Sequence, residues 1–180
     1  MTIFFTSDMH LAHENILKYA NRPFRTTRQM AQAIRTKHNE VVAPEDTVYN
    51  LGDFTLEDVS TVRKYEKYLR GFNGHHHLIL GNHDRWNPFR YLDVGFLSVH
   101  TSLELDHHPL SSLHLVHDPS VFCLVPEGGV LVHGHVHTLY RDIYKEGKYA
   151  INVGVDVWSF EPVPMDKILE IVKGEEEDDL

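Results

Sequence analysis

Short apolar runs that end in polar residues recur through the first half of the chain, and each predicts a buried strand. These runs are residues 2–8 (TIFFTSD), 45–53 (EDTVYNLGD) and 76–84 (HHLILGNHD). Between them, apolar side chains recur with the spacing of a helix, in residues 13–20, 27–42 and 56–70. The longest of these segments is expected to bury the face that carries Met30, Ala33, Ile34 and Val41.

The pattern changes after residue 95, where short β-rich runs follow one another between turn residues. These runs are FLSVHTSLEL, SSLHLVHD, GGVLVHGHVH, TLYRDIY and KYAINVGV. A final helix is predicted over residues 165–174. Because strand–helix alternation gives way to strands alone, we predict a two-sheet α/β sandwich rather than one parallel sheet. Residues 1–173 are expected to form a single domain, and the acidic residues 174–180 a disordered tail.

Composition narrows the possible partners and the compartment. The 180 residues include 26 acidic and 17 basic side chains, so the net charge of −9 disfavours nucleic acid and anionic membranes as general partners. No apolar stretch is long enough for a signal peptide or a membrane span, and a cytoplasmic protein is expected. Cys123 is the only cysteine, and its apolar neighbours (VFCLV) predict a place in the core.

Polar side chains that can bind metals follow the predicted strands. They are Asp8, His10, Asp53, Asn82, His117, His135 and His137. Ligands bind at the carboxyl ends of strands in open α/β sheets, so these segments are expected to converge. Taken one at a time, each signal has a plain alternative: Asp-x-His and GNHD are common in turns, and HGHVH could be a metal-scavenging patch.

The order of the motifs is far more specific than any one of them. Asp-x-His (8–10), Gly-Asp (52–53), Gly-Asn-His-Asp (81–84), a lone His (117) and Gly-His-x-His (134–137) occur in succession. This set resembles the calcineurin-like metallophosphoesterases, in particular the small single-domain enzymes of bacteria and phages, from Thr6 to about Trp158. The resemblance implies a metallophosphoesterase-like fold, a two-sheet β-sandwich flanked by helices in four layers, α/β/β/α.

The resemblance also implies a role for each motif residue. Asp8, His10 and His137 match the ligands of one metal, and Asn82, His117 and His135 those of a second. Asp53 matches the carboxylate that bridges both metals. His83 matches the catalytic histidine beside the substrate, and Asp84 the carboxylate that orients it. The two divalent ions could be manganese, zinc, iron, nickel or cobalt, with manganese or zinc preferred.

The implied activity is metal-dependent hydrolysis of phosphate esters, with attack by a metal-bridging hydroxide and His83 as general acid. No added segment could roof the site, which favours phosphodiesters over small monoesters. One alternative is a nuclease of the same superfamily, which the charge of −9 disfavours. Another is a non-catalytic interaction domain, and such a domain would be expected to lack ligands that this chain retains. A histidine-rich metal store would not explain Asn82 or Asp53.

Residues outside the motifs have two interpretations each. Arg85, Trp86 and Arg90 are candidate substrate contacts, although for Trp86 the alternative of an anchor in the core or its loop is favoured. Arg22 has a similar double interpretation. The ten histidines outside the motifs are interpreted as structural, with a possible outer role at the metals for His133 and a possible substrate contact for His13.

Overall fold

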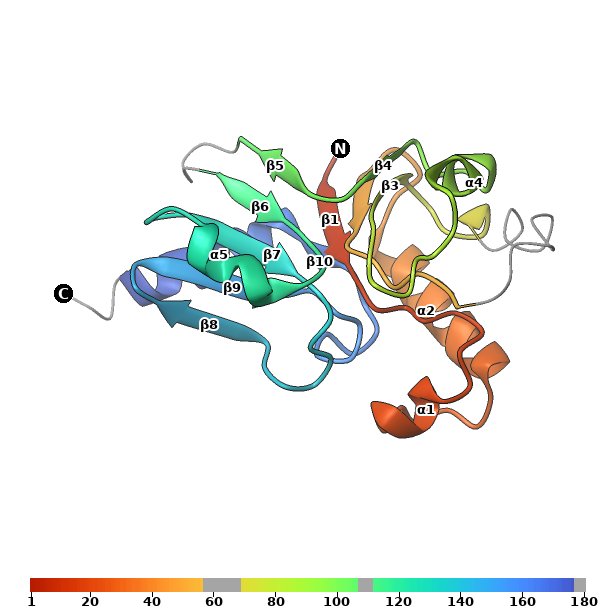
Figure 1. Cartoon of the computed structure of the whole chain (residues 1–180). Coiled ribbons are helices and arrows are strands. Elements are labelled where there is room, and N and C mark those ends of the chain that lie inside the picture. The colour runs from red at the N-terminus through yellow and green to blue at the C-terminus, as the bar shows by residue number, and fades with distance from the viewer. Residues whose placement is uncertain (57–68, 107–111, 177–180) are drawn as a thin grey trace.

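The computed structural model describes residues 1–56, 69–106 and 112–176. Figure 1 shows two β-sheets next to each other, with helices packed against them. Each sheet has five strands and mixes parallel with antiparallel pairs. The predicted fold class, a two-sheet α/β sandwich flanked by helices, is therefore confirmed.

The first sheet has the strand order β10-β1-β2-β3-β4. Its strands are β1 (Ile3–Thr6), β2 (Thr47–Asn50), β3 (His75–Ile79), β4 (Ser98–His100) and β10 (Val163–Pro164). All neighbours are parallel except β1 and β10. Since β4 belongs to this sheet, the chain changes sheets after residue 100 and not at residue 95, where the pattern of the sequence changes.

The second sheet has the order β5-β6-β7-β9-β8. Its strands are β5 (Leu103–Leu105), β6 (Leu113–Leu115), β7 (Val130–His133), β8 (Asp142–Lys145) and β9 (Lys148–Asn152). The central strands β6, β7 and β9 are parallel, and the two edge strands are antiparallel to their neighbours. Within each sheet the parallel strands therefore have their carboxyl ends at the same edge, and the loops that follow them can lie close together.

Helices cover the two sheets unevenly. They are α1 (Ile16–Tyr19), α2 (Thr27–Val41), α4 (Pro88–Asp93), the 3₁₀ helix η2 (Pro119–Leu124) and α5 (Met165–Glu176). Most of the helix predicted over residues 56–70 lies outside the described residues. None of the helices in the described ranges combines the length and apolar character needed to cross a membrane.

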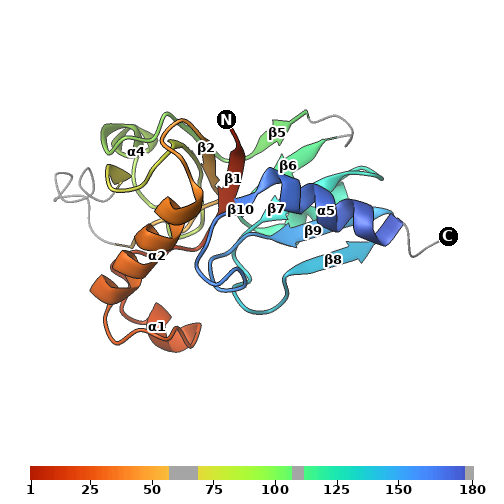
Figure 2. The same ribbon diagram turned by 180° about the vertical axis from the view of Figure 1, so that it is seen from behind.

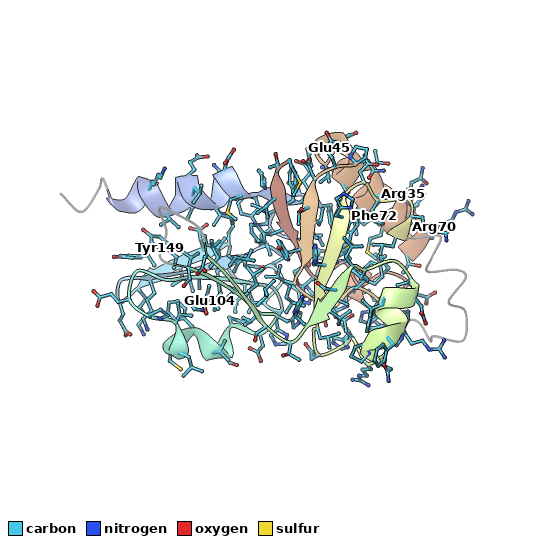
Figure 3. The ribbon with its side chains drawn as sticks, turned by 90° about the horizontal axis from the view of Figure 1, so that it is seen from above. Arg35, Glu45, Arg70, Phe72, Glu104 and Tyr149 are labelled. Carbon is cyan, nitrogen blue, oxygen red and sulfur yellow. The ribbon has the colours of Figure 1, made fainter. Side chains whose placement is uncertain are left out.

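Alternate residues along the strands pack on opposite faces and define the layers. On β7, Val130 and Val132 join the core shared with the first sheet, whereas Leu131 packs beneath η2. On β3, Ile79 faces that shared core, while Leu78 packs with α2 and α4. Helix α5 packs on the shared core beside β1, as the view from behind shows (Figure 2). Figure 3 shows the second sheet between α5 and η2, and side chains filling these layers.

Two expectations about buried positions are wrong. On α2 the buried residues are Met30, Ile34 and His38, at successive intervals of four, whereas Val41 at the end of the helix is 42% exposed. Cys123 is exposed rather than part of the core. A 3₁₀ helix has three residues per turn, so Phe122 and Val125 can face the sheet together while Cys123 points outward.

Candidate metal centre

The carboxyl ends of the parallel strands bring the predicted ligands to one place. Asp8 and His10 follow β1, Asp53 follows β2, and Asn82 and His83 follow β3, in neighbouring strands with aligned register. From the second sheet, His117 follows β6, and His135 and His137 follow β7. An isolated parallel bridge between Ser7 and Gly154 joins the two sheets at this edge.

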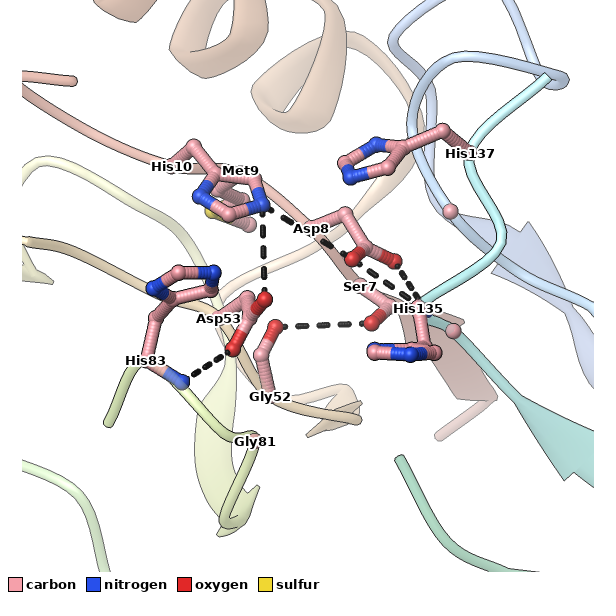
Figure 4. A network of polar contacts seen from close by, with 12 residues as sticks. Ser7, Asp8, Met9, His10, Gly52, Asp53, Gly81, His83, His135 and His137 are labelled. Carbon is pink, nitrogen blue, oxygen red and sulfur yellow. Dashed lines mark hydrogen bonds and ion pairs between the residues drawn. The ribbon is translucent and has the colours of Figure 1, made fainter. Parts of the chain in front are cut away.

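Donor atoms from these loops lie close together (Figure 4). Those of Asp8, His10 and His137 are within 4.8 Å of one another, and so are those of Asp8, Asp53 and His117. The first group is the ligand set expected for one metal. Asp53 Oδ2 lies 3.4 Å from both His10 Nε2 and His117 Nε2, which belong to the two different predicted sets. Asp53 is thus placed where a bridging carboxylate is expected.

Asn82 and His135 complete the second predicted set. Asn82 Oδ1 is 3.1 Å from His117 Nε2 and 3.0 Å from His135 Nδ1, and the two ring nitrogens are 3.3 Å apart. In Figure 4 the Asp8 carboxylate lies between the rings of His135 and His137. The carboxylate also accepts a hydrogen bond from the backbone N–H of His135, at 3.0 Å from Oδ2. All seven predicted ligands therefore lie in one cluster.

Hydrogen bonds on the far side of two rings fix which nitrogen faces the cluster. His117 Nδ1 donates to the carbonyl of Leu51 at 2.7 Å, and His137 Nδ1 donates to Asp156 Oδ2 at 2.8 Å. With Nδ1 occupied in this way, Nε2 is the nitrogen that faces the cluster, which is the usual arrangement for ligating histidines. His10 Nε2 is buried and has no hydrogen-bond partner among the described residues, although it points at Asp53.

Arg22 and Asp156 support the centre and were not assigned this role from the sequence. The Arg22 guanidinium contacts both oxygens of Asp156, with Nε at 2.7 Å and Nη2 at 2.9 Å. It also donates to the backbone carbonyls of Asp8 and Met9, at 2.6 and 3.0 Å. Arg22 is only 5% exposed, so its interpretation as a substrate contact is wrong. The one available signal for Asp156 was its acidic side chain between Val155 and Val157, in the turn that follows β9.

Backbone strain is concentrated at the cluster. Asp8, His10, Asp53, His135 and His137 all have φ between 48° and 74°, the left-handed region that non-glycine residues rarely adopt. These are five of the seven predicted ligands. Such strain costs on the order of 1–3 kcal/mol per residue and persists only where the surroundings impose it, typically at functional sites.

Close backbone approach explains the glycines before the ligands. A Cβ on Gly134 would collide with Ser7 Oγ and Asp8 Oδ2, and one on Gly81 would collide with the Asp53 side chain. Neither residue has a positive φ. Glycine is therefore required at these positions because a side chain would displace the carboxylates, and not because the chain turns sharply there.

The charges of the cluster suit a divalent cation. Burial raises the pKa of Asp8. Burial would also raise the pKa of Asp53, but the hydrogen bond and charge of His117 lower it to about 2. Burial lowers the pKa of His10 to about 3, so its ring is neutral with a free lone pair. Burial opposes a charge on His117, but Asp53 and Asp8 raise its pKa to about 9. Two buried carboxylates among imidazoles therefore stabilise positive charge between them, and the donor set fits such an ion.

The role expected for Asp84 is wrong. Its carboxylate accepts hydrogen bonds from the backbone N–H groups of Asp53, Gly81 and Phe54, at 2.7, 2.9 and 3.1 Å. The ring of His83 has no bond to it: His83 Nδ1 is buried without a hydrogen-bond partner among the described residues. Asp84 holds the loop that carries Asp53 against the loop of the GNHD motif. Its own burial raises its pKa to about 6.

The remaining candidate residues lie around the cluster. His13 approaches it: His13 Nδ1 is 3.4 Å from His10 Nδ1. His133 is fully buried and bonds to Gly134 and Tyr140 rather than to any ligand side chain. Trp86 stacks on Tyr91, with ring centroids 5.0 Å apart, which favours the interpretation of a loop anchor. Arg85 and Arg90 are exposed, and their contact with substrate stays a prediction.

Comparison with known proteins places this chain among relatives of similar length. No family model matches it. It is 29% identical to the Gene 66 protein of Mycobacterium phage D29, over 97% of this chain and 98% of the phage protein. In structure it resembles a protein of unknown function, AQ665 of Aquifex aeolicus, with a TM-score of 0.72, 24% identity and coverage of 94% of this chain and 98% of that one.

A more similar sequence establishes the family. The uncharacterized protein MJ1445 of Methanocaldococcus jannaschii is 34% identical over 176 residues, which cover 95% of this chain and 91% of the relative. This chain therefore belongs to the same family as MJ1445.

Proposed function

We propose that this protein is a metal-dependent phosphohydrolase of the calcineurin-like metallophosphoesterase type, acting on phosphate esters and preferring diesters. The observation that supports it most is the convergence of seven predicted ligands from five separate segments. In that cluster the buried Nε2 of His10 points at Asp53 and has no hydrogen-bond partner among the described residues. Such a donor set fits a pair of divalent ions, with manganese and zinc as first choices.

The residues around the cluster have complementary tasks. Divalent ions bound there would neutralise phosphoryl oxygens and promote ionisation of water. Asp8, His10 and His137 would hold one ion, Asn82, His117 and His135 the other, and Asp53 both. Asp156 and Arg22 keep the His137 ring in place, while Asp84 fixes the backbone of the Asp53 loop.

His83 is proposed as the general acid. Its backbone N–H donates to Asp53 Oδ1 at 2.9 Å, which ties it to the centre without using its ring. The ring centroid lies 5.4 Å from that of His10, and Nδ1 has no protein partner within the described residues. A ring that is positioned by its backbone and has a nitrogen to spare can pass a proton to a departing alkoxide.

Hydrolysis assays with added metals test this function. Purified protein should hydrolyse bis(p-nitrophenyl) phosphate when loaded with manganese or zinc, and p-nitrophenyl phosphate more slowly. Chelation should abolish both activities, and added metal should restore them. Metal analysis should give close to two ions per chain. Full activity in a preparation verified to be metal-free would contradict the proposal.

A further inference from the structure

An apolar pocket adjoins the candidate metal centre on the side of His135. Its volume is about 460 Å³, within the range of small-molecule sites. It is lined by η2 and the residue before it, by the loop after β7, and by β8 and β9. His135 belongs both to this lining and to the predicted ligands, so the pocket begins at the centre itself.

The fold creates this pocket because η2 covers only part of the second sheet. Leu131 and Ala150 pack beneath η2, where Val121 and Phe122 contact them. Ile143 on the edge strand β8 pairs with Ala150, so its side chain leaves the sheet on the same face. With only six residues, η2 leaves Ile143 39% exposed. The small side chain of Ala150 forms the floor between Phe122 and Ile143.

Polar groups in the lining already have partners within the protein. The Asp118 carboxylate accepts a hydrogen bond from the backbone N–H of Ser120 at 2.8 Å. The Tyr140 hydroxyl is 3.2 Å from His133 Nε2, and Lys145 Nζ is 3.5 Å from Glu146. The lining is therefore mostly apolar, and its polar groups are the His135 ring and side chains such as Asp118 and Lys145, which are exposed. A bound group would gain chiefly from burial of its own apolar surface.

We propose that this pocket binds the apolar organic group of the phosphate ester whose phosphoryl group lies at the metal centre. The substrate class is accordingly an ester of an aryl or branched alkyl alcohol, with Phe122, Ile143 and Ala150 as the residues that determine specificity. This inference rests on the proposed function, because it assumes that a phosphoryl group binds beside His135.

Binding of two phosphonates that differ only in their organic group tests the pocket. Benzylphosphonate and methylphosphonate are titrated by calorimetry into zinc-loaded wild type, Ile143→Asp and Tyr144→Asp. Tyr144 is the matched control, because it is the next residue of β8, is 46% exposed and does not line the pocket. Wild type should bind benzylphosphonate at least about tenfold more tightly than methylphosphonate, which is the range expected for added apolar groups in a pocket.

The two variants show whether a preference for the benzyl group arises in this pocket. Ile143→Asp should lose most of the benzyl preference while methylphosphonate affinity stays unchanged, and Tyr144→Asp should keep the wild-type ratio. The ratio of kcat/KM for benzyl p-nitrophenyl phosphate over methyl p-nitrophenyl phosphate, which share a leaving group, should follow the same order. Equal binding of the two phosphonates by wild type, or equal loss in both variants, would overturn the pocket alone. Failure of methylphosphonate to bind would overturn the proposed function as well.

Discussion

Two groups of buried histidines in this protein differ in what surrounds them. His10 and His117 face the carboxylate of Asp53 at the carboxyl ends of the strands. His38 on α2 and His76 on β3 stack behind the first sheet, with ring centroids 5.4 Å apart, and the Nε2 of each bonds to the carbonyl of Asn73. Both groups contain a buried ring nitrogen without a partner in the described residues, in His10 and in His38. An unpaired nitrogen alone therefore does not identify a metal site.

Carboxylates and backbone strain distinguish the two groups. Burial lowers the pKa of His38 to about 4 and of His76 to about 3, and among the described residues the opposing effect comes from backbone groups such as the Asn73 carbonyl rather than from a carboxylate. At the candidate centre, Asp53 and Asp8 overcome burial and raise the pKa of His117 to about 9. Left-handed backbone occurs at His10 but at neither His38 nor His76. The comparison teaches that a centre for cations is built by buried negative charge held in a strained frame.

Removal of the shared carboxylate should have the largest effect. Asp53→Ala should bind less metal at both predicted positions and reduce hydrolysis to near background, because Asp53 lies between His10 and His117. The measurements are metal content and kcat on bis(p-nitrophenyl) phosphate, with circular dichroism as a check on folding. His114→Ala is the control, since His114 bonds to Ser112 away from the cluster. Activity within a few fold of wild type would remove Asp53 from the site.

Replacement of His83 should separate proton transfer from metal binding. We expect His83→Ala to slow an alkyl or nucleoside ester by about 10²–10⁴-fold, because its alkoxide cannot leave without a proton. A p-nitrophenyl ester needs less help and should be slowed much less. Metal content should not change. Equal losses on both esters would instead indicate that His83 stabilises charge on the phosphate, and loss of a metal would make it a ligand.

Loss of the support behind His137 should have an intermediate effect. Asp156→Asn keeps the shape of the side chain but weakens its bonds to His137 and to Arg22. Outer partners of this kind typically contribute about 10–100-fold to metal affinity or activity, and we expect a loss in that range. The apparent dissociation constant of one metal should rise more than that of the other. Glu161→Gln, which breaks an exposed ion pair with Lys37, should change neither. Unchanged metal affinity in Asp156→Asn would show that His137 needs no support.

The smallest predicted effect is on stability and its dependence on pH, and it concerns His38, one of the two stacked histidines behind the first sheet. The pKa of His38 is lower in the folded protein, about 4, than in the unfolded chain, 6.5. The contribution of neutral His38 to the free energy of unfolding is therefore present above pH 6.5 and is lost as the pH falls toward 4. Between about pH 7 and pH 5.5 the loss should be about 1 kcal/mol.

Denaturant unfolding of wild type and His38→Leu at both pH values measures this contribution, with chelator present so that metal binding does not intervene. The variant should lack about 1 kcal/mol of the wild-type decrease and keep its metal-dependent hydrolysis. An identical pH dependence in the two proteins would show that His38 is not kept neutral by burial.

Local patterns were sufficient for most of the secondary structure. Apolar runs that end in polar residues predicted β1, β2 and β3, and helical spacing predicted α2, because these signals depend on neighbours in sequence. The short elements α4, η2 and β10 were not predicted. Each has six residues or fewer, so packing on other elements decides whether it forms.

The sequence by itself determined which residues gather at the centre, because each strand end is a local pattern and the order of the motifs can be read directly along the chain. Tertiary structure alone decided what supports them. Asp84 bonds to backbone groups of a different loop, and Arg22 meets Asp156 across 134 positions of the chain. It also decided that His38 is buried and Cys123 exposed. The packing of the two sheets decides which residues distant in sequence come into contact. No local sequence pattern specifies those contacts.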